Sequence, residues 1–414
     1  MAGRFTSPRV ISQIFWVLTI AAVLIWSQVP SYVVGWDLRV YENAMHSLQA
    51  GHDPYSDGIA VQRAYHAETV HAPGSVAPFT YVYSPLTLPL VRVVGHLPTA
   101  ISASLYWILF ALCVFAAIWV GLQLVEEKEK PVIALLAPSA VFFPGLLQND
   151  VLFSGNIAYI FYGLVLIAAV VGWRQGKWRW FYLAVLAASC FKAPLLSLLA
   201  IPVFSARRQW LPAGVTGALG LSLFAIQPLL WPVLFRHYLE AVELQFSFNH
   251  DFSSSPAGLL ADALYDVIPY GITSTVFYIF YAILFASILF YFSRRFLAGR
   301  FSIKQWAPVL LIGVILLNPR IMEYDVAPIT LLMATVAWRF LIRGNTVARA
   351  SFLGMVIFFA LNRAAPRAWR PTECIILVGL FFAGLWDLYT LEDHASVKDE
   401  GLSDDNATVN LAAV

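Results

Sequence analysis

The chain has 414 residues, of which 60% are hydrophobic and only 12% are charged, and its mean hydropathy is +0.72. A soluble domain carries about 25% charged residues because it needs them to cover its surface, so this composition excludes a soluble fold. The net charge of +2 is spread over short connections between apolar runs, and it provides no basic patch for binding nucleic acid.

Long apolar runs separated by short charged connections predict an all-α, polytopic transmembrane protein with about ten to twelve helices. The first run, 11–29, follows Arg4 and Arg9 and has no small-x-small cleavage site behind it, so we expect an uncleaved first helix. Several late runs are shorter than the roughly 20 residues of a perpendicular span, and such helices usually border a cavity. The later runs are 101–125, 131–147, 157–172, 181–204, 211–230, 271–292, 307–318, 326–340, 350–361 and 372–388.

Lys and Arg favour the cytoplasmic side of a membrane, which places the N-terminus inside and the polar segment 30–100 outside. This first external loop and a second one at 231–270 belong to a single transmembrane domain, 1–390. The remaining residues, 391–414, are acidic and polar, so we expect a disordered cytoplasmic tail. The predicted location is the inner, cytoplasmic membrane of the cell, crossed many times.

The run 181–204 is long enough for one crossing, yet basic residues lie at both of its ends, at Arg179 and at Arg207. Because both ends then belong on the cytoplasmic side, an even number of passes is required. A hairpin of two short helices broken near Lys192 and Pro194 meets this requirement if the break is buried in protein or faces water. Lys192 either turns toward a cavity, where it is a natural counter-ion for phosphate, or snorkels to the interface.

The residues that directly follow the first predicted helix carry apolar side chains at helical spacing from Tyr41 to Leu48. This spacing predicts an amphipathic helix on the outer membrane surface, with Asp37 at its start. A carboxylate at this place can act as a general base toward an acceptor hydroxyl. The alternative is that Asp37 only caps the helix, where its oxygens satisfy free backbone amides.

Aromatic and polar residues fill the rest of the first external loop. Tyr55, Tyr81 and Tyr83 are candidates for lining a substrate site, and interfacial anchoring of their rings is an equally good explanation. The segment 85–98 is apolar enough to rest in the interface as a second, lid-like element.

A polar break at 318–325 separates two late apolar runs on the predicted outer side. Within it, Arg320 can hold a phosphate by a forked hydrogen bond, or it can pair internally with Glu323 or Asp325.

The histidines and carboxylates of the second external loop have no fixed short spacing, which makes them a weak metal signal. The three cysteines lie inside apolar runs and indicate no thiolate site. We therefore expect no metal and no cofactor.

Short motifs stand at defined places relative to these spans. They are Asp37-x-x-x-Tyr41, Gly51-x-x-Pro54-Tyr55, Tyr83-x-Pro85, Gly155-Asn156, Lys192-x-Pro194, and Asn318-Pro319-Arg320 with Tyr324-Asp325. Their order along the chain resembles the glycosyltransferase-C superfamily, and specifically glycosyltransferase family 87, the polyprenyl-phosphate-mannose-dependent alpha-1,2-mannosyltransferases. The resemblance covers most of the chain and implies a hexosyltransferase of the cell envelope in which Asp37 is the catalytic aspartate.

The expected partners are a polyprenyl-phosphate sugar donor, a glycan or glycolipid acceptor and membrane lipid, with no nucleic acid. If Asp37 faces outside, a cytosolic sugar nucleotide cannot reach it, whereas a donor presented from the bilayer can. Lys192 and Arg320 are then the candidates for holding the donor phosphate. The candidates for lining the substrate site are Tyr41, Tyr55, Tyr81, Tyr83, Asn156, Glu323 and Asp325.

Two other classes of function fit the same features. A transporter or lipid flippase would also bury ionisable residues and use broken helices, although the sequence shows no internal repeat by eye. A sugar-binding membrane scaffold without catalytic activity is the third alternative.

Overall fold

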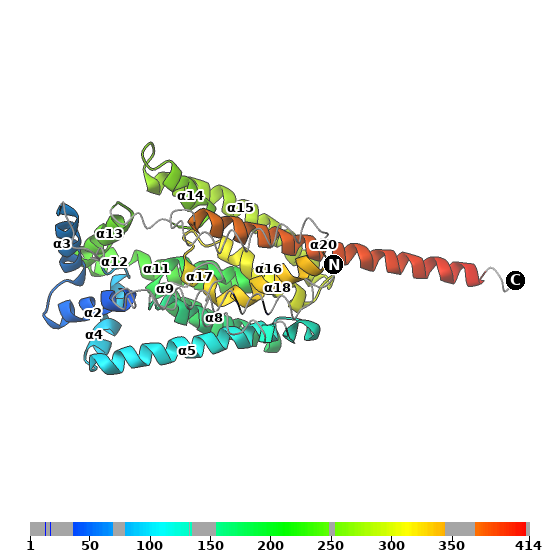
Figure 1. Ribbon diagram of the computed structural model, residues 1–414, viewed down its shortest axis with the longest axis horizontal. Coiled ribbons are helices and arrows are strands. Elements are labelled where there is room, and N and C mark those ends of the chain that lie inside the picture. The colour runs from blue at the N-terminus through cyan, green and yellow to red at the C-terminus, as the bar shows by residue number, and fades with distance from the viewer. Residues whose placement is uncertain are drawn as a thin grey trace.

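The computed structural model describes residues 36–68, 79–131, 133–134, 155–247, 253–343 and 369–410, together with residues 13 and 17. Every regular element in these ranges is a helix, which confirms the predicted all-α class for the described part of the chain. Most of the long helices run along the long axis of the molecule and form one bundle, as Figure 1 shows.

Six helices of the described residues are long and apolar enough to cross a membrane. The predicted ten to twelve helices are not confirmed, because four other apolar helices are shorter and the predicted runs 11–29, 131–147 and 350–361 fall almost wholly outside the described residues. The six candidate spans are Ala100–Gln123, Ala158–Gln175, Trp210–Leu230, Gly271–Leu297, Tyr324–Ile342 and Arg370–Leu391.

The exposure of apolar side chains separates the lipid-facing helices from the central one. α11 (Trp210–Ala225) and α15 (Tyr270–Leu297) expose large apolar residues such as Leu219 and Phe280. α16 (Ile303–Leu316) is instead buried on all sides from Trp306 to Leu316. Because lipid is as apolar as these side chains, helices in a membrane associate mainly through close packing and interhelical hydrogen bonds, and α16 provides the centre of that packing.

The predicted broken hairpin is present. α9 (Arg179–Phe191) ends where Lys192 adopts an extended backbone; Pro194 has no N–H to donate to the carbonyl four residues earlier, so an unbroken α-helix through this point is disfavoured. The chain returns through η5 (Ala193–Leu199) and α10 (Ala200–Ser205). The indole nitrogen of Trp173, at the end of α8 (Ala158–Gln175), donates a hydrogen bond to Ser205 Oγ at 2.7 Å. Both open ends of the hairpin therefore lie at the same end of the bundle.

A second broken hairpin is formed by α16 and α18 (Thr330–Arg343), joined by α17 (Glu323–Val326) and η6 (Ala327–Ile329). The guanidinium of Arg339 donates to both carboxylate oxygens of Glu129, at 2.6 and 2.8 Å, and to the backbone oxygen of Lys304 at 3.0 Å. These contacts bring the end of α18 to the start of α16, so the polar break at 318–325 lies at the tip of the hairpin.

The bundle has two different ends. Arg174 donates to Gln123 at the end of α5 (Thr99–Gln123), and Arg207 donates to the backbone oxygen of Leu297. We call this the basic end. At the opposite end, called the site end, lie α2 (Trp36–Gln49), α3 (Pro54–Ala67), α4 (Leu88–Gly95), α12 (Gln227–Leu230) and α13 (Pro232–Ser247), as Figure 1 shows.

α20 (Trp369–Asn410) packs against α16 and α18 and then projects beyond the bundle (Figure 1). Its bounds include 391–410, and the disordered tail expected at 391–414 stays a prediction.

Candidate functional site

Asp37, Asn156 and Lys192 form a chain of polar contacts at the site end. The side-chain nitrogen of Asn156 donates to Asp37 Oδ2 at 2.9 Å, and its side-chain oxygen accepts from Lys192 Nζ at 3.4 Å. Asn156 is only 4% exposed. Three separate segments, the start of α2, the start of α8 and the tip of the first hairpin, therefore meet at one amide group.

The backbone before α8 explains why α2 can approach so closely. Gly155 has a φ of +77°, which favours glycine, and a Cβ atom added there would lie 2.5 Å from Leu38 Cγ. Asn156 also uses its side-chain oxygen to accept from the backbone nitrogen of Ala158, which begins α8. The Gly155-Asn156 pair thus provides both the space for α2 and the amide that contacts Asp37.

Lys192 points to the tip of the second hairpin. Its ammonium lies 3.7 Å from the ring centroid of Tyr324 and 5.7 Å from that of Tyr83. Cations are attracted to aromatic faces at such distances. The carboxylate of Asp325, which is buried, lies within electrostatic range of both Lys192 and Arg320. The described contacts of Lys192 thus belong to a buried polar site, which favours the site interpretation over snorkelling.

Tyr41 and Tyr83 form the next layer beside Asp37. Their hydroxyl oxygens are 2.6 Å apart, and Tyr41 also accepts from the backbone nitrogen of Ile157 at 3.1 Å. Burial, together with the nearby charge of Asp37, raises the pKa of both phenols above the usual 10.0. Both side chains therefore stay neutral and hydrogen-bonding at physiological pH.

Tyr55 and Tyr81 lie behind this layer. The Tyr55 hydroxyl donates to the backbone oxygen of Tyr83 at 2.6 Å, and the Tyr81 hydroxyl is 2.6 Å from Thr87 Oγ1. Both rings are buried in the cluster that holds α2, α3 and α13 together. Predicted as substrate-lining residues, they are placed by the structure in the packing that supports the site.

Arg320 lies at the tip of the second hairpin, where its backbone nitrogen donates to Asn318 Oδ1 at 3.1 Å. Its guanidinium lies 5.9 Å from the ring centroid of Phe246, the last aromatic residue of α13. Asp325 Oδ2 accepts from the backbone nitrogen of Met322 at 2.9 Å. The side chain of Glu323 lies outside the described residues.

A serine loop at 253–255, which was not predicted as part of the site, holds this tip. Ser253 Oγ accepts from the backbone nitrogen of Ile321 at 2.8 Å, Ser254 N donates to the backbone oxygen of Ile321, and Ser255 Oγ donates to that of Pro319. The run of three serines next to a polar loop was the available signal, because such hydroxyls commonly bond to backbone groups.

The second external loop is tied to the first by α13. His237 Nδ1 lies 2.6 Å from Asp53 Oδ2, and Arg63 Nη2 lies 2.5 Å from Glu240 Oε1.

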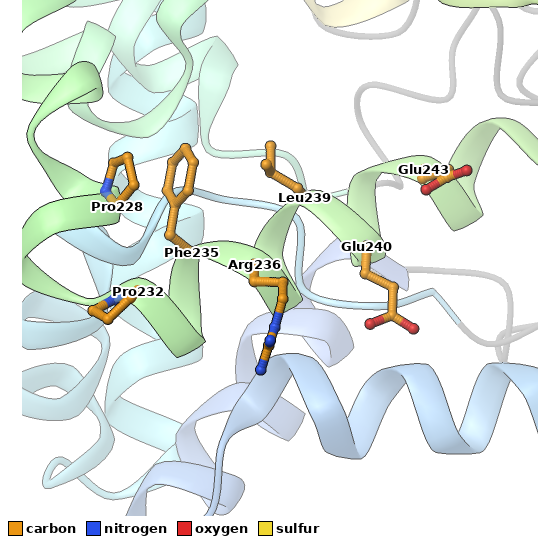
Figure 2. A pocket seen from close by; sticks show the side chains of 7 residues that line it. All are labelled: Pro228, Pro232, Phe235, Arg236, Leu239, Glu240 and Glu243. Atoms are coloured by element: carbon orange, nitrogen blue, oxygen red, sulfur yellow. The ribbon is translucent and has the colours of Figure 1, made fainter.

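Within the described ranges no group of three or more His, Cys, Asp or Glu side chains has the arrangement of a metal site. A groove of about 520 Å³ runs along α12 and α13, and Figure 2 shows Arg236 and Glu240 pointing to one side and Leu239 to the other.

Fold and site together define a helical membrane protein in which the tips of two broken hairpins meet at Lys192 and Tyr324, and Asn156 links Lys192 to an acidic residue at the start of a short helix. Comparisons of the chain with protein-family models, curated proteins and solved structures give no match. The resemblance to the glycosyltransferase-C superfamily therefore stays a prediction.

Proposed function

We propose that this protein is an inverting glycosyltransferase that moves a sugar from a polyprenyl phosphate to an acceptor on the non-cytosolic face of the cytoplasmic membrane. One observation carries the proposal. A single amide, that of Asn156, contacts both the Asp37 carboxylate and the Lys192 ammonium. A base for the acceptor and a cation for the leaving phosphate are thereby held side by side.

Asp37 is the proposed general base. As the acceptor hydroxyl attacks the anomeric carbon, its proton passes to the carboxylate, and the bond between the anomeric carbon and the phosphate oxygen breaks. The electron pair of that bond leaves with the phosphate. Attack from the face opposite the phosphate inverts the anomeric centre, so a beta-linked donor gives an alpha-linked product.

Lys192 and Arg320 are the proposed phosphate-binding residues. The lipid phosphate gains negative charge as it leaves, and fixed cations in a site shielded from water stabilise this charge strongly. Both cations already lie near one buried carboxylate, Asp325. A phosphate bound beside Asp325 would add a second anion to the site, and both cations are needed to balance the two anions. We therefore assign the phosphate to Lys192 and Arg320 together.

The sugar class and the location rest on the family resemblance. We propose mannose as the sugar, a glycan or glycolipid as the acceptor, and the inner membrane as the location. The alternative, a transporter or flippase, is favoured by one observation, the two broken hairpins with ionisable tips. Broken helices of this kind also form the binding sites of transporters.

Transfer from radiolabelled polyprenyl-phosphate mannose to a membrane extract distinguishes these functions. We expect Asp37→Asn to lower transfer by about 10²- to 10⁴-fold while donor binding is kept. The matched control is Asp57→Asn, because Asp57 is a carboxylate of the same loop with an exposed side chain beside His52. Movement of the donor without a covalent product would overturn the proposal, as would full transfer by Asp37→Asn.

A further inference from the structure

The last turn of α13 reaches across to the tip of the second hairpin. The guanidinium carbon of Arg320 lies 5.9 Å from the ring centroid of Phe246, inside the distance of about 6 Å at which an aromatic face attracts a cation. The charge of Arg320 also acts at longer range on a second aromatic residue of α13, Tyr238. Burial raises the pKa of Tyr238 to about 12, and the positive charge of Arg320 acts on it in the opposite direction.

The position of Phe246 is determined by contacts at the other side of α13. Ala241 and Leu244 are buried in the cluster that contains Tyr55 and Tyr83. The polar contacts of His237 and Glu240, described above, join the same helix to α3 and to Asp53 before it. Helix α13 is therefore held to the first external loop along most of its length.

The backbone around Arg320 is equally well held. Carbonyl groups on both sides of it accept hydrogen bonds from the serine loop, and Tyr281 donates to the backbone oxygen of Asn318 at 3.1 Å. The Arg320 side chain itself is long and can adopt many rotamers. A fixed backbone does not select one rotamer, so the direction of the guanidinium depends on the groups around it, which include the Phe246 ring and the Asp325 carboxylate.

We infer that Phe246 is a positioning residue whose ring holds the Arg320 guanidinium in the direction that binds the donor phosphate. This inference rests on the proposed function, since it deepens the role given there to Arg320. It also means that α13 couples the first external loop to the phosphate end of the site. A displaced α13 would lower affinity for the lipid phosphate without touching Asp37.

The test measures binding of polyprenyl phosphate, without a sugar, to the purified full-length chain in nanodiscs. We expect Phe246→Leu to weaken binding by about 3- to 30-fold, and Phe246→Tyr to retain it because the aromatic face is kept. Phe235→Leu is the matched control, since Phe235 lies on the same helix and lines the groove of Figure 2. Transfer assays should show the same change in donor KM with kcat unaltered.

The Arg320→Gln background supplies the decisive comparison. If Phe246 acts through Arg320, Phe246→Leu should have no further effect on binding once the guanidinium is gone. An equal loss in both backgrounds, or unchanged binding by Phe246→Leu, overturns the inference. Wild-type binding of polyprenyl phosphate without any transferred sugar would reject the proposed function alone, whereas absence of wild-type binding would reject both.

Discussion

The carboxylate of Asp37 accepts a hydrogen bond of 2.9 Å from the side chain of Asn156, although 119 positions separate the two residues. The carboxylate is thereby oriented by a group that is itself fixed at the start of α8. An amide is well suited to this task, because its nitrogen can contact the acid while its oxygen contacts Lys192.

Replacing Asn156 should therefore lower catalysis more than stability. A hydrogen bond to a charged group contributes about 1.5 to 3 kcal/mol, so Asn156→Ala should reduce kcat by about 10- to 150-fold. Asn156→Asp should be at least as harmful, because it removes the donor and places a second negative charge beside Asp37. Steady-state transfer assays measure both. Wild-type kcat in Asn156→Ala would show that Asp37 does not need this orientation.

Gly155 offers a steric test of the close approach between α2 and the start of α8. Gly155→Ala should cost about 1 to 2 kcal/mol in backbone strain and should also displace Leu38, whose Cγ lies 2.5 Å from the added Cβ. Gly176→Ala is the matched control, since Gly176 also has a positive φ, +69°, but has nothing within 4 Å of its Cβ position. Both variants should unfold at lower temperature, and only Gly155→Ala should lose transfer. Equal activity of the two variants would contradict the prediction.

Lys192 should be essential for donor binding. Lys192→Met keeps the length of the side chain and removes its charge, so binding of polyprenyl phosphate should weaken by at least about 30-fold. Lys177→Met, in the exposed connection between α8 and α9, is the control for loss of one positive charge. Retained affinity in Lys192→Met would show that the lysine only neutralises Asp325.

The phenols of Tyr41, which is partly buried, and Tyr83, which is buried, should make the folded chain less stable at alkaline pH. Their pKa is raised in the folded chain above the usual 10.0, because burial disfavours the phenolate. Their contribution is thus fully present below pH 10.0 and is lost as pH rises above it, by about 1.4 kcal/mol per pH unit for each group. Tyr83→Phe should flatten this loss in denaturant unfolding curves. An unchanged alkaline slope would indicate that Tyr83 ionises in the folded chain.

The ion pair of Glu129 and Arg339 is predicted to act on stability and not on chemistry. Glu129→Ala leaves a buried guanidinium without its carboxylate, which should destabilise the chain by about 3 to 5 kcal/mol. The double replacement of Glu129 and Arg339 by leucine should be less harmful, because no isolated charge remains. Thermal unfolding in nanodiscs compares the two. Greater destabilisation by the double replacement would contradict the prediction.

Several features could be predicted from local sequence. Low charge and long apolar runs indicated membrane helices, because a surface that faces lipid is apolar, whereas a surface that faces water carries charged residues. Basic residues at both ends of 181–204 indicated the hairpin broken at Lys192, which the structure contains. Helical spacing after Asp37 indicated α2. Each of these features depends on a contiguous stretch of chain and its environment.

The pairing of distant groups was decided only by the tertiary structure. No local pattern indicated that Asn156 would bridge Asp37 and Lys192, that Phe246 would meet Arg320, or that Arg339 would bind Glu129 across 210 positions. Tyr55 and Tyr81 are found behind the site, in a buried cluster that also contains Ala241 and Leu244 of α13. Such contacts depend on how deeply each hairpin enters the bundle and which helix faces which. These quantities are set by packing between segments far apart in the chain, and hydropathy along one segment carries no information about them.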